Sequence, residues 1–197
     1  MELMVVVSIM ALLASPSLLS IAAQGGQSFT SQIYDLQATL SLVRTAAMAK
    51  NTFVWAGIGE GKVDGKDAMI VVAYASQDGL NDVTADNLAP IMKDRIFPGL
   101  GMMPITRVLT GQDPGGTDLH TTSANWSLPN PTVAGAVVPL TQAILFSPTG
   151  EAFLASTPLS YIEIGLQPLH GAVASGGNNF AALQISGIAS QMEVFRN

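Results

Sequence analysis

Two acidic stretches of the sequence hold residue types that could bind a hard cation. Asp78, Asp82 and Asp86 lie in one polar stretch, and Asp113 and Asp118 lie in another. Carboxylate oxygens gathered in a loop are the ligands that Ca²⁺ takes in proteins. Neither stretch has the spacing of an EF-hand loop, and aspartate is also a common turn residue. These five aspartates are calcium candidates that turn formation explains more simply, and the sequence predicts no other cofactor.

The usual catalytic patterns are missing from the sequence. His120 and His170 lie in unlike loops with no His-Glu-x-x-His pair, and there is no cysteine, so a zinc site has no support. The glycines of 57–62 miss the spacing of a phosphate-binding loop, and Val63 stands where Ser or Thr would bind magnesium. No Gly-x-Ser-x-Gly elbow occurs. We therefore expect that the protein is not an enzyme.

Glu2 is an ionisable residue at the edge of an apolar run that continues to residue 23. Beyond Glu2 the run carries no charge, and as a helix it would reach about 30 Å, the depth of a bilayer's hydrocarbon core. Pro16 within the run is expected to kink such a helix. An ionisable group in this position indicates a function and a partner. We predict that residues 1–23 span a membrane or mediate assembly.

The residues after this run predict an amphipathic helix over 24–50. Lys50 and Asn51 provide a suitable helix end, because a basic residue complements the helix dipole and Asn accepts a left-handed cap. Apolar residues at spacings of three and four form one stripe, which comprises Phe29, Ile33, Leu36, Leu40, Val43 and Ala47. This stripe must pack on another element.

From Thr52 the pattern changes to β-branched and aromatic runs, which predict strands. The first two, 52–58 and 67–75, are expected to form a hairpin through 59–66, and 76–90 is expected to be a loop or a short helix. The remaining predicted strands are 91–97, 105–109, 140–146, 151–155, 159–166, 180–188 and 191–196.

The expected fold is α+β: a long N-terminal helix, 1–50, packs its second half on a C-terminal antiparallel β-sheet domain, 51–197. An irregular insertion is expected at about 110–136.

Composition limits the partners of this chain. A length of 197 residues suits one compact domain with an anchor better than two domains. Charged residues make up 11% of the sequence and the net charge is −6. Nucleic-acid binding relies on clustered Lys and Arg, so no nucleic acid is expected as a partner.

The start of the chain, Glu2-Leu-Met-Val-Val-Val-Ser-Ile-Met-Ala-Leu-Leu-Ala14, resembles the N-terminal signature of type IV pilins and type II secretion pseudopilins. Further along, Leu42-Val-Arg-Thr-Ala-Ala-Met-Ala-Lys-Asn-Thr-Phe-Val54 resembles the helix-to-strand segment of the H-type minor pseudopilins. Shorter matches occur at 144–150, 183–188 and 194–196. The sequence departs from the family pattern at Met1, because the basic leader, its glycine and the usual Phe-Thr-Leu are not present. We expect that the reading frame begins upstream.

The resemblance implies a structural subunit of a pilus-like or type II secretion filament, assembled through its apolar helix. Implied partners are other pilin or pseudopilin subunits, the inner membrane before assembly, and a prepilin peptidase. The implied location is the bacterial inner membrane with a periplasmic head, and later a periplasmic or extracellular filament. Glu2 would pair with the N-terminal amine of a neighbouring subunit. The implied assembly residues are Glu2, Leu3, Met4, Val5, Val6, Val7, Ile9, Met10, Leu12, Leu13 and Pro16.

Three other interpretations remain open from the residues. The apolar run could be a secretory signal peptide, although its flank is acidic where a signal peptide is basic. The chain could instead be a membrane-anchored periplasmic or extracellular binding module, with the insertion at 110–136 and the loop 175–179 as its ligand face. An anchored enzyme is the third interpretation.

Overall fold

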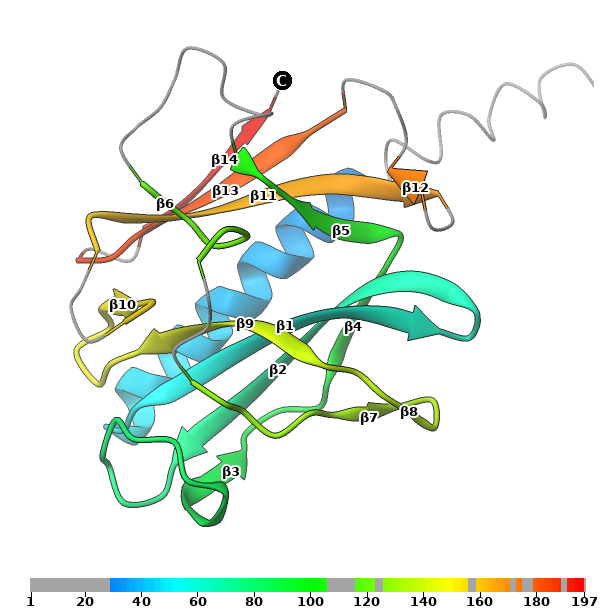
Figure 1. Ribbon diagram of the computed structural model, residues 1–197. Helices are drawn as coiled ribbons and strands as arrows, with labels where there is room; N and C mark the ends of the chain where they lie inside the picture. Colours follow the sequence, from blue (N-terminus) through cyan, green and yellow to red (C-terminus); the bar gives the residue numbers. More distant parts are fainter. Residues whose placement is uncertain are drawn as a thin grey trace, which may run out of the picture.

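The computed structural model describes residues 29–105, 116–122, 126–155, 159–170, 173–174, 179–188 and 191–196. These residues form an α-helix over 29–50, a short 3₁₀ helix η1 (Ala85–Asn87), and strands that are grouped into two larger sheets and one small one. Figure 1 shows the helix lying along both larger sheets, with its first turn beside one sheet and its last turn beside the other.

The first sheet is built around the hairpin of β1 (Val54–Val63) and β2 (Lys66–Ser76). The other strands of this sheet are β3 (Leu88–Pro90), β4 (Arg95–Pro98), β9 (Leu140–Phe146) and β10 (Ala152–Phe153). The strand order is β10-β9-β1-β2-β3, with β4 also paired to β2, and every pairing is antiparallel. Asp64 and Gly65 join β1 to β2 with positive φ angles of 51° and 75°, as a two-residue hairpin turn requires.

The second sheet is built around β11 (Tyr161–His170). Its other strands are β5 (Leu100–Met103), β6 (Thr117–Asp118), β12 (Val173–Ala174), β13 (Ala181–Ser186) and β14 (Met192–Arg196). The order is β12-β11-β13-β14, and β5 and β6 also pair with β11. The β6 pairing is parallel, unlike the others. The separate pair β7 (Thr132–Val133) and β8 (Ala136–Val137) forms the small sheet.

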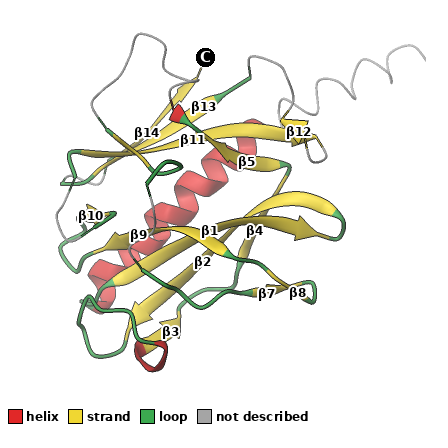
Figure 2. Ribbon diagram, in the orientation of Figure 1, coloured by secondary structure: helices red, strands yellow, loops and turns green. Residues whose placement is uncertain are grey.

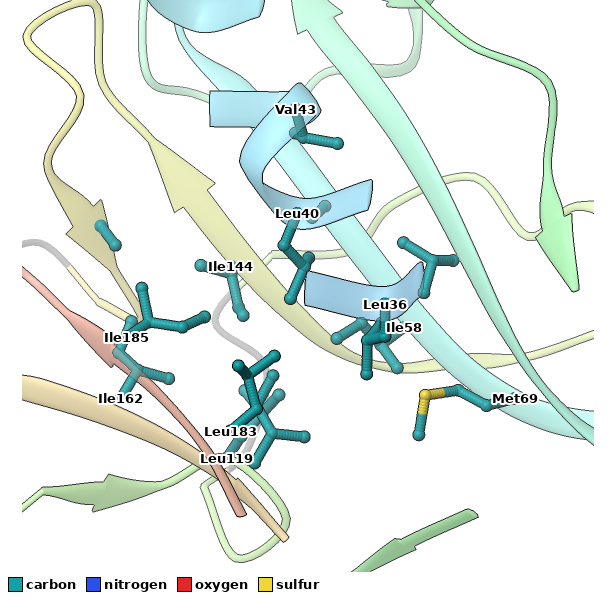
Figure 3. Close-up of a cluster of buried hydrophobic side chains, with 14 of the residues drawn as sticks. Leu36, Leu40, Val43, Ile58, Met69, Leu119, Ile144, Ile162, Leu183 and Ile185 are labelled. Atoms are coloured by element: carbon teal, nitrogen blue, oxygen red, sulfur yellow. The ribbon is translucent and has the colours of Figure 1, made fainter. Parts of the chain in front are cut away.

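The main hydrophobic core lies where the helix meets both sheets. Every residue of the predicted helix stripe is at most 3% exposed, so this prediction is confirmed. Leu36 and Leu40 point toward Ile58 of β1 and Ile144 of β9, while Leu183 of β13 and its neighbours enter the same cluster from the second sheet (Figure 3). One narrow stripe of helix residues therefore supplies apolar cover to two sheets.

The expected fold class is wrong. We expected a long N-terminal helix packed on a single antiparallel β-sheet domain, whereas the described chain is mostly antiparallel β-structure with one helix of 22 residues, 29–50 (Figure 2). The physical reason lies in the apolar pattern, which changes before residue 29. Beyond that point apolar residues recur only every third or fourth position, which suits a helix with one buried face, and both sheets need that face.

The expectation of a pilin with a transmembrane helix is not supported either. Among the residues that the structure describes, no helix is long and apolar enough to cross a membrane. The helix 29–50 instead buries its apolar stripe against protein and exposes its opposite face. The predicted membrane span, 1–23, lies outside the described residues.

Most predicted strands are present, with shifted ends. The hairpin connection is two residues long, because 59–63 and 66 belong to the strands and were not expected there. The predicted strands 140–146, 159–166, 180–188 and 191–196 correspond to β9, β11, β13 and β14. The segment 147–150, between β9 and β10, forms a turn that closes with a hydrogen bond from Gly150 N to Ser147 O (2.9 Å). The strand expected at 91–97 is reduced to β4, and β5 was not expected.

Three glycines alternate along β1 and let another segment lie directly on the sheet. Built Cβ atoms at Gly57, Gly59 and Gly61 would meet Leu140, the Pro139 carbonyl and the side chain of Val138, respectively. The glycine run 57–62 is therefore strand, although 59–62 were expected in the hairpin connection. Small residues are needed here because the 138–140 segment crosses at backbone distance.

We expect Leu40→Ala to lower the free energy of unfolding by about 2–5 kcal/mol, because it leaves a cavity where the helix meets both sheets. Leu42→Ala is the matched control: Leu42 is on the same helix but 60% exposed, so its replacement should change stability by less than about 0.5 kcal/mol. Chemical denaturation of both variants measures the difference. Equal losses would contradict the packing of this helix.

We expect Gly59→Ala to destabilise the protein by about 1–3 kcal/mol, because the added methyl group overlaps the Pro139 carbonyl. Lys62→Ala, an exposed position on the same strand, is the control and should be close to neutral. Denaturation midpoints measure both changes. A neutral Gly59→Ala would show that the 138–140 segment does not lie against β1.

Candidate assembly surface

The predicted assembly residues, Glu2 to Pro16, lie outside the described residues, so their roles stay predictions. The nearest part of the structure is the first turn of the helix. Phe29 is 3% exposed, and the guanidinium of Arg196 lies 5.9 Å from the centre of its ring. Arg196 also donates a hydrogen bond to the Thr30 hydroxyl (2.8 Å). Strand β14 therefore holds the helix at its first described residues.

Two further contacts hold the middle and the end of the helix. Gln37 donates its Nε2 hydrogen to the carbonyl of Met192 in β14 (2.9 Å), and Arg44 donates Nε to the carbonyl of Gly150 in the β9–β10 turn (3.1 Å). These bonds lie beside the buried stripe and join the helix to both sheets. The helix is thus fixed in position along most of its length.

The loop after β2 brings together two of the calcium candidates through an asparagine. The Asp78 carboxylate accepts hydrogen bonds from the Ser76 hydroxyl (2.7 Å), Leu80 N (2.9 Å) and Asn87 Nδ2 (2.8 Å). Asn87 also donates to Asp82 Oδ1 (3.4 Å). Donors aimed at these oxygens stabilise a turn, as the sequence also allowed. The backbone bond from Leu80 and the Ser76 hydroxyl, more than Asn87, lower the pKa of Asp78.

The other calcium candidates are not brought together. Asp86 lies in η1, Asp113 is outside the described residues, and Asp118 in β6 accepts hydrogen bonds from Ile105 N (3.1 Å) and His120 N (2.9 Å). Within the described ranges no group of three or more His, Asp or Glu side chains could hold a metal ion.

The aromatic and histidine candidates have ordinary surroundings. Trp55 is fully buried, and it packs in an apolar cluster on the outer face of the first sheet, where Trp126 is partly buried against it. His120 is exposed, and its carbonyl accepts a bond from Gln142 Nε2 (3.4 Å). The side chain of His170 lies outside the described residues.

The outer face of the helix is the feature that sequence reasoning missed. Tyr34 is 54% exposed and Leu42 is 60% exposed, while Ala38 and Ala49 are exposed on the same side. A surface helix normally carries charged residues opposite its buried stripe. Asp35 is the only charged residue on this face of the described helix. The positions of Tyr34 and Leu42, opposite the stripe, could have revealed this face from the sequence.

We expect Asp78 to make stability depend on pH in acid. Its pKa is lowered in the folded protein, so the unfolded chain binds a proton first as pH falls below the ordinary value of about 3.9. The contribution is complete above that value and is lost as pH falls through the folded pKa. Asp78→Asn should therefore flatten the acid limb of the stability profile, and Ser76→Ala, which removes one donor, should flatten it partly. An unchanged limb in Asp78→Asn would contradict this.

Comparison of the chain with protein-family models, with curated proteins and with solved structures gives no match. The resemblance to pseudopilins therefore stays an expectation from the sequence segments named above. What the structure contributes is a helix that is fixed to both sheets by a buried stripe and that has an exposed, nearly uncharged outer face. Such a face can mediate contact with another protein.

Proposed function

We propose that this chain is a structural subunit of a filament of the type IV pilus or type II secretion kind. The described residues would be its head, and the apolar N-terminal segment would mediate assembly. The observation that carries the proposal is the position of Phe29. It is buried in the first described helical turn, and only the five residues Gln24-Gly-Gly-Gln-Ser28 separate it from the apolar run that ends at Ala23.

This arrangement suits a subunit whose head must hold a defined orientation in an assembly. A helix held by six buried residues and by bonds to Met192 and Gly150 transmits a displacement at its first turn to both sheets. An anchored binding module needs only a tether to stay at a surface, so it does not require a helix that is fixed to both sheets. The proposal uses no catalytic residue.

Glu2 is assigned to register between subunits. A carboxylate among apolar segments needs a partner, and the N-terminal amine of a neighbouring subunit supplies the opposite charge. The resemblance to pseudopilins at residues 2–14 also supports this assignment. The interaction would set the relative position of neighbouring chains.

We expect Glu2→Ala to reduce assembly. The full chain has no cysteine, so a single cysteine at Val7 reports contacts between chains by disulfide formation. Removing one partner of a buried ion pair costs about 3–5 kcal/mol, so crosslinking should fall by at least about tenfold. Glu2→Asp keeps the charge and should retain most of the crosslinking.

Two controls accompany this experiment. The thermal unfolding of the head should be the same in the wild type and in Glu2→Ala, since residue 2 lies outside the described fold. Negative-stain microscopy should show filaments that contain the wild-type chain. Undiminished crosslinking in Glu2→Ala would remove the role of Glu2, and a chain that forms no crosslink and no filament would favour a binding module instead.

A further inference from the structure

The start of the helix is held by strand β14 at two points along its length. Arg196 donates a hydrogen bond from Nη2 to the Thr30 hydroxyl (2.8 Å), and Gln37 donates Nε2 to the carbonyl of Met192 (2.9 Å). The two helix positions are seven residues apart, which is about 10 Å along the axis, and the two strand positions are four residues apart, which is about 13 Å. Because these spans are similar, the start of the helix runs alongside β14 in the opposite direction.

An apolar contact adds to these bonds at the first described helical residue. Phe29 is 3% exposed, and the Arg196 guanidinium lies 5.9 Å from the centre of its ring, within the range of a cation–π interaction. The first turn is ordinarily the weakest part of a helix, because its amide groups have no partners within the helix and the end frays. Here one side chain of β14 contacts the first two described residues of the helix together.

Strand β14 is itself anchored in the second sheet. Its residues all pair with β13, from Ile185↔Met192 to Ala181↔Arg196, and β13 pairs in turn with β11. A pull on the first helical turn is therefore passed through Arg196 and Met192 into the middle of a sheet. Because the helix lies along β14, a pull in the direction of the helix axis loads both contacts together and does not break them one after the other.

We propose that Arg196 is a positioning residue that clamps the first helical turn against tension from the segment before Phe29. This inference rests on the proposed filament, in which that segment holds the head in the assembly, so that a displacement of neighbouring subunits pulls on the chain at residue 28. Tension passes through any covalent connection, so it reaches Phe29 across the five intervening residues. The clamp keeps the helix from unwinding at its first turn while the head is pulled.

Force spectroscopy of the full chain in detergent tests the clamp, because a chain without native cysteine accepts two handles at chosen positions. Handles at Ser28→Cys and Leu80→Cys pull on the helix from its first turn. Handles at Leu80→Cys and Val137→Cys pull on a part of the chain that excludes the helix. Leu80 and Val137 are 57% and 66% exposed, so handles there should leave the fold intact.

The two pulling geometries distinguish a clamp from a residue that only adds stability. With handles at residues 28 and 80, Arg196→Gln should unfold at least about fivefold faster than the parent chain at the same force, because a charge-assisted hydrogen bond and a ring contact are lost where the force enters. With handles at residues 80 and 137, it should unfold at the parent rate.

Two further variants act as controls. Thr30→Val removes the acceptor hydroxyl and keeps the contact between Arg196 and Phe29, so it should have part of the effect of Arg196→Gln. The double variant should be no worse than Arg196→Gln alone, because both changes remove the same hydrogen bond. Arg95→Gln, which removes an exposed arginine from β4 in the other sheet, is the matched control and should leave the rate unchanged in both geometries.

Two results would overturn the clamp. Equal acceleration by Arg196→Gln in both geometries would assign Arg196 to general stability, and no acceleration in either would show that it does not hold the first turn. Crosslinking of Val7→Cys chains tests the filament separately. A chain that crosslinks but shows no acceleration loses the clamp alone, whereas a chain that forms no crosslink and no filament loses the proposed function and with it the role of the clamp in assembly.

Discussion

The rest of the structure depends on a single stripe of six helix residues that two sheets share. Each sheet has an apolar inner face, and neither is covered without the helix side chains that enter between them. Leu36 and Leu40 occupy the middle of this stripe, where the strands of both sheets converge. The outer sides of the sheets are covered separately, the first by the segments around Leu128 and Val138 and the second in part by Ile105. Among the described elements, the helix is therefore the one that packs on both sheets.

A second link joins the sheets beyond the end of the helix stripe. The Glu60 carboxylate on β1 accepts a hydrogen bond from the backbone N–H of Met102 on β5, and Gln167 of β11 donates to the carbonyl of the same residue (3.1 Å). The backbone N–H and the carbonyl of Met102 are thus both hydrogen-bonded to side chains, one from each sheet. This link lies on the hairpin where the sheets extend past the helix, so it complements the apolar contact with polar bonds.

The helix and its buried face could be predicted from the sequence, because six apolar residues spaced three or four positions apart predict a helix with one buried face. The hairpin of β1 and β2 was predictable for a similar reason. The division into two sheets was not, since it depends on β5 and β6 pairing with β11, about 60 and 45 residues away in sequence, and both strands are short. The glycines of 57–61 were misread because their role is set by the distant segment 138–140. The outer helix face was visible in the sequence at Tyr34 and Leu42, but its exposure could be judged only in the folded structure.

The contact between Arg196 and the first helical turn has a consequence for how the head is made. During synthesis the helix leaves the ribosome well before the strands that cover it, and β14 emerges last of the described elements. Until then the stripe from Phe29 to Ala47 has no complete partner, and an uncovered apolar helix is open to chaperones or to misassociation. Pairings between distant segments also slow folding, because a long loop must close before they form. Completion of this fold therefore waits on β14, the last of the described strands to be translated.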